Sequence, residues 1–275
     1  MSGLVAYKMT GSGNDFVMLD GRTTDAGTWS RLLIQTLCDR RVGMGADAVV
    51  FVAPGSGPDR IRMTYFNSDG SPAPMCGNAA LCAAQLARRL EMVGEGPIVL
   101  ETGAGTYAAN CTAPGRARLR LGGIEEPTAV VGADLKPDES RSARVCVGVP
   151  HVVVLVADVD GVDVLHRGRE LRFHPGAGPD GANVDFVAQG DGRNRWSMRT
   201  YERGVEGETY ACATGAAAAA VALVGWNVAE PPVEVVTRTG LVLTIDGRRS
   251  GEGGLEDVWV EGEARLVYRA VVELQ

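Results

Sequence analysis

The sequence predicts an α+β protein made of two similar domains, each a mostly antiparallel sheet or barrel wrapped around a central helix. Short strand patterns are frequent, whereas helix patterns are few and do not alternate regularly with strands, which argues against a doubly wound parallel sheet. Cys76 and Cys212 each open a run of small residues that leads into an alanine-rich apolar stretch. Other landmarks also recur about half a chain apart, which indicates a duplication.

The duplication has a nearly constant offset. Cys76 and Cys212 are 136 residues apart (212 minus 76) in a chain of 275 residues. Segment 13–17 corresponds to 148–152, and segment 45–47 corresponds to 181–183. We therefore predict domains at 1–130 and 131–264, with the C-terminal strand 265–275 able to pack back on the first domain. Because pockets favour domain interfaces, the expected active site is the cleft between the domains.

Strands are predicted where β-branched and aromatic residues gather between turn residues. In the first half these segments are 16–19, 48–52, 61–66, 98–101 and 118–121. In the second half they are 145–149, 152–156, 184–187, 195–201, 233–237, 241–245, 258–263 and 264–273. The Gly, Pro and acidic residues near 130–142 make that segment the expected linker.

Helix patterns cover 28–38, 77–92, 162–168 and 214–226. The helix that follows Cys76 has a polar edge late in its course, at Gln85 and Arg89. Segment 216–224 contains no polar side chain, so this helix must be buried nearly all round. It is too short to span a bilayer, and strands packed around it would account for its composition.

Composition narrows the class of protein. A chain with 45% hydrophobic and 22% charged residues is globular, and a net charge of −7 with scattered basic residues argues against nucleic-acid binding. The first residues lack a signal-peptide pattern, and no apolar run approaches the ~20 residues of a membrane span, so we expect a cytoplasmic protein. Six cysteines are too few for a disulfide scaffold, and four of them sit in apolar segments: Cys38, Cys82, Cys111 and Cys146.

The remaining two cysteines, Cys76 and Cys212, are placed at predicted helix N-termini. Such a position supplies unpaired N–H groups and a positive dipole end, which bind a carboxylate and lower a thiol pKa from ~8.5 towards neutrality. The N–H groups of Gly77, Asn78, Ala213 and Thr214 would hold the carboxylate. Two opposed thiols could remove an α-proton from one face of an amino acid and return one to the other face.

Several segments together resemble the diaminopimelate epimerase family, and they span nearly the whole chain. They are 11–17 (Gly-Ser-Gly-Asn-Asp-Phe-Val), 38–47, 66–71 (Phe-Asn-Ser-Asp-Gly-Ser), 75–78 (Met-Cys-Gly-Asn), 150–151 (Pro-His), 183–186 (Asn-Val-Asp-Phe), 201–204 (Tyr-Glu-Arg-Gly), 207–209 (Gly-Glu-Thr) and 212–215 (Cys-Ala-Thr-Gly). The resemblance implies two alike α/β domains and a cofactor-independent epimerase that converts LL-diaminopimelate to the meso form in lysine and cell-wall synthesis.

The resemblance also implies roles for individual residues. Cys76 and Cys212 match the catalytic acid/base pair, and His151 and Glu202 match groups that could polarise the thiols. Arg203 suits a distal carboxylate, which it would bind through two hydrogen bonds. The positions expected to bind substrate are Asn14, Asn67, Gly77, Asn78, Asn183, Glu202, Arg203, Ala213 and Thr214.

Some positions depart from the family pattern. Val149 stands where the family usually has Asn, so one amide that would contact the far end of the substrate is absent. Ala79, Leu81 and Ala213 replace the usual Gly, Arg and Gly. The Val149 departure motivates an alternative within the same class, a racemase or epimerase of another amino acid.

Other interpretations remain open from the sequence. The two cysteines could form a redox pair, although there is no Cys-x-x-Cys, or the chain could be a non-catalytic binding protein. His151 could be a buried structural histidine, and the asparagines could simply close turns. We expect no metal, NAD or pyridoxal phosphate, because the histidines lack ligand spacing, no Gly-x-Gly-x-x-Gly is complete and lysines are scarce. The expected partner is a small amino acid, and a homodimer is left open.

Overall fold

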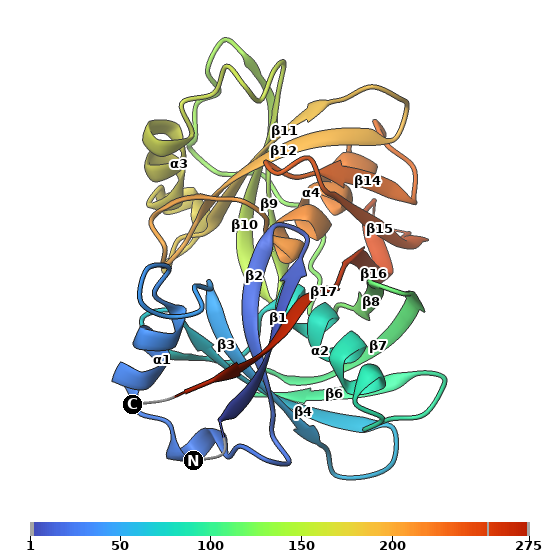
Figure 1. The fold of residues 1–275 in the computed structure, drawn as a ribbon. Coiled ribbons are helices and arrows are strands. Elements are labelled where there is room, and N and C mark those ends of the chain that lie inside the picture. Colours follow the sequence, from blue (N-terminus) through green and yellow to red (C-terminus); the bar gives the residue numbers. More distant parts are fainter. Residues whose placement is uncertain (1–2, 252, 274–275) are drawn as a thin grey trace. The chain divides into compact units, whose positions relative to one another are not determined.

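A computed structural model describes residues 3–251 and 253–273 of the chain (Figure 1). Its contacts divide the chain into two units, unit 1 with Met1–Leu119 and Glu261–Gln275, and unit 2 with Arg120–Val260. The chain enters unit 2 at residue 120, ahead of the expected linker. The reason is local pairing, because Glu125 and Thr128 donate backbone hydrogen bonds to Cys146 and Arg144 in unit 2.

Unit 1 is a mixed sheet with helices against it. Its elements are β1 (Leu4–Gly11), β2 (Asn14–Asp20), a 3₁₀ turn (Ala26–Thr28), α1 (Arg31–Cys38), β3 (Ala48–Pro54), β4 (Arg60–Asn67), β5 (Pro72–Ala73), α2 (Gly77–Arg89), β6 (Ile98–Thr102), β7 (Gly105–Ala113), β8 (Arg116–Arg120) and β17 (Arg265–Val272). Strand β1 lies between β2 and β17 and is antiparallel to both. The pairs β2–β3 and β4–β6 are parallel, whereas β3–β4, β6–β7 and β7–β8 are antiparallel.

Unit 2 repeats this arrangement. Its elements are β9 (Glu139–Val147), β10 (Val149–Val156), α3 (Val164–Arg172), a 3₁₀ turn (Pro175–Ala177), β11 (Asn183–Gln189), β12 (Arg195–Glu202), β13 (Gly207–Thr209), α4 (Ala213–Gly225), β14 (Val233–Val236), β15 (Val242–Arg249) and β16 (Leu255–Glu263), the last of which runs past residue 260. Here β10–β11 and β12–β14 are parallel, and β9–β10, β11–β12 and β14–β15 are antiparallel.

The two units correspond strand by strand. Strands β2, β3, β4 and β6 begin at residues 14, 48, 60 and 98, and their counterparts β10, β11, β12 and β14 begin 135 residues later, at 149, 183, 195 and 233. The parallel and antiparallel pairings match as well. The predicted α+β class with two similar units is therefore confirmed, with the addition that each sheet contains parallel pairs at equivalent places.

The helices pack against the sheets because both faces of the central strands are apolar. In unit 1, Val17 and Leu19 of β2 join a core with Ile34 and Leu37 of α1. Side chains alternate along a strand, so Phe16 lies on the opposite face of β2 from Val17, and α2 contacts β2 as well as β1 and β3. In unit 2, α3 takes the place of α1, and Val164 and Leu171 pack with β10 and β11.

The two alanine-rich helices behave as their sequences predict. Every residue of 216–224 in α4 is fully buried, and α4 contacts β9, β10, β11, β14 and β15. Helix α2 is buried except at Gln85, Arg88 and Arg89, where its polar edge lies. Within the described residues no helix has both the length and the apolar character needed to cross a membrane.

Four strands were not predicted: the two short strands β5 and β13, and the longer strands β1 and β7. Strand β1 carries Lys8 in its centre, and the consecutive residues 6–9 are all buried, so both of its faces are covered and its sequence shows no alternation. Strand β7 has a polar, half-exposed sequence without a β-branched run. The predicted strands 145–149 and 152–156 are β9 and β10, and β9 begins at Glu139, so the expected linker is shorter than predicted.

Candidate functional site

In unit 1, Cys76 is the residue at which an extended segment turns into helix α2. Its backbone is extended (φ −140°, ψ 124°), its side chain is half-buried, and its carbonyl accepts the first helical hydrogen bond, from Ala80 N–H at 2.9 Å. The next two residues, Gly77 and Asn78, therefore begin the helix, and their N–H groups have no acceptor within the helix. The predicted placement of Cys76 at a helix N-terminus is correct.

Asn78 is held by a chain of side-chain amides. It is 2% exposed, and its Nδ2 donates to Oδ1 of Asn14 at 2.7 Å. Asn14 in turn donates its Nδ2 to Oδ2 of Asp47 at 3.0 Å. Because a carboxylate only accepts hydrogen bonds, Asp47 fixes which way both amides point. Among the described residues, Oδ1 of Asn78 is left buried without a hydrogen-bond donor.

At Asp47 this series of hydrogen-bonded side chains meets a cluster of charged residues. Arg40 donates to Oδ1 of both Asp15 and Asp47, at 2.7 and 2.8 Å, and Lys8 lies 2.5 Å from Oδ2 of Asp15. Burial raises the pKa of Asp15, but hydrogen bonds and charge from Arg40 and Lys8 outweigh it and lower this pKa from 3.8 to about 2. Asp15 therefore stays ionised and holds Arg40, which also binds the Asp47 carboxylate that orients Asn14.

A glycine brings strand β1 close to the start of α2. A Cβ on Gly11 would lie 2.9 Å from the carbonyl oxygen of Asn78 and 2.9 Å from Sγ of Cys82. Only glycine allows this approach without a shift of the first helical turn. Cys82 itself is fully buried, and burial raises the pKa of its thiol well above 9.0, so it is a packing residue.

Asn67 ends strand β4 and shapes the turn that leads to Cys76. Its Nδ2 donates to the Ser71 hydroxyl at 3.0 Å, and its carbonyl accepts from Gly70 N–H at 2.9 Å. The next residue, Ser68, donates its N–H to the Asp47 carbonyl at 3.0 Å. Asn67 thus closes a turn that is held by the backbone of Asp47, the residue whose side chain binds Asn14.

In unit 2, Cys212 has the equivalent position at the start of α4. Its backbone is again extended (φ −134°, ψ 112°), and its Sγ accepts a hydrogen bond from Gly215 N–H at 3.3 Å. The Thr214 hydroxyl also lies 3.3 Å from this sulfur. Cys212 is half-buried and Ala213 is buried, so small residues surround the thiol.

The electrostatics of Cys212 correct one expectation from the sequence. Helix position was expected to lower the thiol pKa towards neutrality. Instead, burial, together with the charges of Glu202 and Asp185, raises the pKa of Cys212 well above 9.0 and outweighs the hydrogen bonds from Thr214 and Gly215. Helix-end stabilisation is therefore present but is not the dominant effect.

His151 is fully buried and is connected to Cys212 through Thr214. Its Nδ1 lies 2.7 Å from Oδ2 of Asp185, and its Nε2 lies 3.1 Å from the Thr214 hydroxyl oxygen. The other carboxylate oxygen of Asp185 accepts from the Thr200 hydroxyl at 2.7 Å. Asp185 also touches α4, since a Cβ on Gly215 would lie 2.4 Å from its Oδ1.

Asn183 and Arg203 lie beside the hydrogen-bonded series formed by Asp185, His151 and Thr214. The Asn183 side chain accepts from Arg203 N–H at 2.8 Å and donates to the Pro150 carbonyl at 3.4 Å. The Arg203 side chain is half-buried, and within residues 3–251 and 253–273 its guanidinium has no ion pair or hydrogen bond. A cation in that state is available to an anionic ligand.

The structure thus brings the predicted site residues together in two sets. Unit 1 joins Cys76, Gly77 and Asn78 to Asn14, and unit 2 joins Cys212, Ala213 and Thr214 to His151, Asn183, Glu202 and Arg203. Sequence reasoning missed the supporting residues Lys8, Arg40, Asp47, Asp185 and Thr200. Asp47 and Asp185 lie inside the segments that carry the family resemblance, so both residues were visible in the motifs, but neither was assigned a role.

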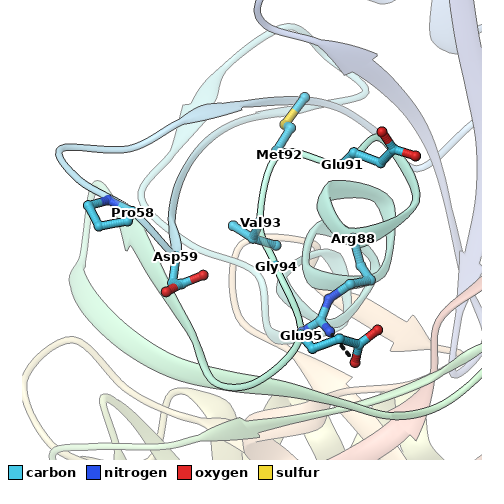
Figure 2. Close-up of a pocket in the computed structure, with 8 residues that line it drawn as sticks. All are labelled: Pro58, Asp59, Arg88, Glu91, Met92, Val93, Gly94 and Glu95. Atoms are coloured by element: carbon cyan, nitrogen blue, oxygen red, sulfur yellow. Dashed lines mark hydrogen bonds and ion pairs between the residues drawn. The ribbon is translucent and has the colours of Figure 1, made fainter.

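A separate pocket lies in unit 1, at the C-terminal end of α2 (Figure 2). It is about 510 Å³ in volume and is lined by residues 58–59, 88 and 91–95. Arg88 pairs there with Glu95 at 2.9 Å. Since α2 rises about 1.5 Å per residue over thirteen residues, this pocket lies roughly 18 Å from Cys76 and is unconnected with the helix start. In the described part of the chain, no group of three or more His, Cys, Asp or Glu side chains could hold a metal ion.

Comparisons with known proteins show which sequences this chain resembles. A family model described as diaminopimelate epimerase matches residues 6–125 and 144–257. The chain is 38% identical to a diaminopimelate epimerase of Gemmatimonas aurantiaca over 96% of this chain and 98% of that one. It is also 38% identical to a diaminopimelate epimerase of Aquifex aeolicus over 95% of each chain.

Solved structures share the fold at low sequence identity. A Bacillus anthracis phenazine biosynthesis protein of the PhzF family has a TM-score of 0.71 with 13% identity, and the match covers 100% of both chains. A hydroxyproline epimerase from Agrobacterium vitis, solved with trans-4-hydroxy-L-proline bound, has a TM-score of 0.68 with 15% identity, over 99% of this chain and 93% of that one. These matches establish the fold.

Proposed function

The chain belongs to the diaminopimelate epimerase family, and from that premise we propose that it inverts one α-carbon of LL-diaminopimelate to give the meso isomer. The resemblance drawn from the sequence motifs is thereby confirmed, and the protein is an isomerase of the epimerase class. The observation that carries the proposal is the paired placement of Cys76 and Cys212, each at the first turn of a buried, alanine-rich helix in equivalent positions of the repeat.

The proposed chemistry uses the two thiols as an acid/base pair. One cysteine, as thiolate, removes the α-proton, and the other, as thiol, delivers a proton to the opposite face of the same carbon. The stereocentre is inverted, and each sulfur exchanges its protonation state with the other. Negative charge that builds up on the substrate carboxylate is met by N–H groups at the starts of α2 and α4, which are oriented before reaction.

Buried polar atoms support the binding of an amino acid. Oδ1 of Asn78 is a buried acceptor that lacks a donor within the described residues, which suits an ammonium group. The half-buried Arg203 guanidinium suits a second carboxylate, and diaminopimelate carries one at its far end. We assign Asn14, Asn67 and Asn183 to the support and lining of this site.

Glu202 has a role that depends on the ligand. Its negative charge is one of the causes that raise the pKa of Cys212. When the substrate ammonium pairs with Glu202, this charge is balanced, and ionisation of Cys212 becomes less costly. Glu202 would thus favour the thiolate when substrate is bound, rather than polarise the thiol directly.

The test is exchange of the α-hydrogen in deuterium oxide. We expect the protein to incorporate one deuterium at the α-carbon of LL-diaminopimelate and to form the meso isomer, as followed by mass spectrometry and chiral separation. Cys76→Ala and Cys212→Ala should each abolish inversion, whereas Cys146→Ala, a control outside the site, should retain it. Absence of exchange with every diaminopimelate isomer would refute the substrate assignment.

One observation favours a second candidate in the same class. Val149 begins β10 at the position that corresponds to Asn14 in β2, so the polar group of the first unit has no equivalent here. A half-buried valine makes this part of unit 2 less polar, which suits an amino acid with a shorter or less polar side chain. The same exchange assay over a panel of amino acids separates the two candidates.

A further inference from the structure

We propose that Thr214, His151 and Asp185 form a proton relay that serves Cys212, with Asp185 as its positioning residue. This inference rests on the proposed function, in which Cys212 must lose and regain a proton. It assigns a role to Asp185, which the family resemblance does not include among the site residues, and it gives His151 a defined path to the thiol.

The geometry forms an unbroken series of hydrogen-bonded atoms. Sγ of Cys212 lies 3.3 Å from the Thr214 hydroxyl oxygen, and this oxygen lies 3.1 Å from Nε2 of His151. Nδ1 of His151 lies 2.7 Å from Oδ2 of Asp185. The side chains of His151 and Asp185 are both 0% exposed, so bulk water does not compete for these bonds.

The donors and acceptors of the series can be assigned from the carboxylate. Asp185 can only accept, and it accepts from Thr200 through Oδ1 and from His151 Nδ1–H through Oδ2. Neutral His151 then has an unprotonated Nε2, which accepts from the Thr214 hydroxyl. The Thr214 oxygen is in turn an acceptor for the Cys212 S–H.

The proton transfer is balanced and needs no further reactant. The Cys212 proton moves to Oγ1 of Thr214 while the Thr214 hydroxyl proton moves to Nε2 of His151. The products are a Cys212 thiolate and a His151 imidazolium, and the imidazolium is stabilised by the adjacent Asp185 carboxylate. Cys212 then takes the α-proton from substrate while His151 stays protonated. When Cys212 later gives a proton back to substrate it is a thiolate again, and the reverse transfer from His151 through Thr214 returns the relay to its neutral form.

Burial makes such a relay useful. The surroundings of Cys212 disfavour an isolated thiolate, since burial raises the pKa of this thiol. An internal acceptor keeps the proton within about two hydrogen bonds of the sulfur, and Asp185 holds the histidine in the tautomer that can receive it.

The equivalent part of unit 1 shows why this is specific to Cys212. There the residue two positions after the cysteine is Asn78, and it is tied to a carboxylate through the Asn14 amide rather than through a histidine. Amides orient neighbouring groups but do not take up protons at neutral pH. Asp47, just before β3, thus orients the side chains at the start of α2 as Asp185 does at the start of α4, but from a different position and without the capacity for a relay, which makes it a control.

The experiment measures ionisation of Cys212 apart from turnover. Cys212 is alkylated with iodoacetamide at neutral pH, and the rate is followed at this residue by peptide mass spectrometry. Asp185→Asn should lower the rate at least about tenfold and lower kcat by roughly 10²- to 10⁴-fold, with a much smaller change in KM. Asp47→Asn should leave the alkylation rate of Cys212 unchanged. Alkylation at alkaline pH reports access to the sulfur, and thermal unfolding reports folding.

A second pair of variants covers the case in which Asp185→Asn does not fold. Thr214→Ser keeps the hydroxyl and should retain the alkylation rate of Cys212, whereas Thr214→Val keeps the shape without the hydroxyl and should lower it as Asp185→Asn does. Wild-type alkylation rates in Asp185→Asn or in Thr214→Val would overturn the relay. If wild-type protein catalyses no α-hydrogen exchange while these alkylation differences persist, the proposed function fails and the relay does not.

Discussion

Gly215 and Asp185 approach each other so closely that a Cβ on the glycine would lie 2.4 Å from Oδ1 of the carboxylate. Gly215 is in the first turn of α4 and donates its N–H to Sγ of Cys212, while Asp185 is on β11 and holds His151. The same contact therefore fixes the distance between the strand that carries Asp185 and the helix that carries the thiol.

Substitution of Gly215 by alanine should disturb both elements. The added methyl group must push Asp185 or the start of α4 aside, which we expect to lower the free energy of unfolding by about 1–3 kcal/mol and to impair α-hydrogen exchange. The measurement is urea unfolding together with the exchange assay. Gly122→Ala is the matched control, since a Cβ there meets no atom within 4 Å. Equal stability of both variants would contradict the close contact.

Asp15 should make the protein sensitive to acid. Its pKa is lowered from 3.8 to about 2 in the folded state, so its contribution to stability is complete above 3.8 and is lost as the pH falls towards about 2. The contribution corresponds to about 2 kcal/mol. Urea unfolding across this range should show a loss in wild type that Asp15→Asn lacks. Glu95→Gln, at a fully exposed side chain, serves as the control. The prediction is contradicted if the stability of wild type and that of Asp15→Asn fall in parallel as the pH is lowered.

Replacement of Arg203 by lysine should weaken binding more than chemistry. Lysine retains the charge but cannot make the two parallel hydrogen bonds of a guanidinium with a carboxylate. We expect KM for diaminopimelate to rise by about 10- to 100-fold with a smaller change in kcat. Steady-state kinetics provide the measurement. An unchanged KM in Arg203→Lys would remove this residue from the binding site.

Val149 should influence which amino acid is accepted. Val149→Asn introduces the polar group that Asn14 supplies at the equivalent place in unit 1. We expect the rate of α-hydrogen exchange with diaminopimelate, relative to that with an apolar amino acid, to rise by about tenfold. Val149→Ile is the control for a change of volume without polarity. The idea fails if the ratio is the same in Val149→Asn and in wild type.

Much of the fold could be predicted from sequence because the duplication is visible in it. The spacing of Cys76 and Cys212 predicted the offset of the strands to within one residue, and the alanine-rich composition of 216–224 predicted the complete burial of that segment of α4. Strand β1 could not be found in this way, because burial on both faces removes the alternation and the ion pair of Lys8 with Asp15 hides a charge in its centre.

The supporting residues of the site could not be predicted because they depend on strand register. His151 and Asp185 are 34 residues apart, and their contact arises because β10 and β11 run parallel with His151 opposite Asn183. This register puts Asp185 two residues further on, on the same face of the sheet. The predicted direction of the Cys212 pKa shift was also wrong. The position of a residue in a helix can be predicted from sequence, but its burial by distant strands cannot.

The pairing of β17 with β1 has a consequence for biosynthesis. The first unit is built from residues that come before and after the second unit in the sequence. As the nascent chain leaves the ribosome, every residue of the second unit emerges before the strand that completes the first. The unit that starts the chain therefore cannot be completed until the whole of the second unit has been synthesised, and until then β1 offers an open edge to other polypeptides.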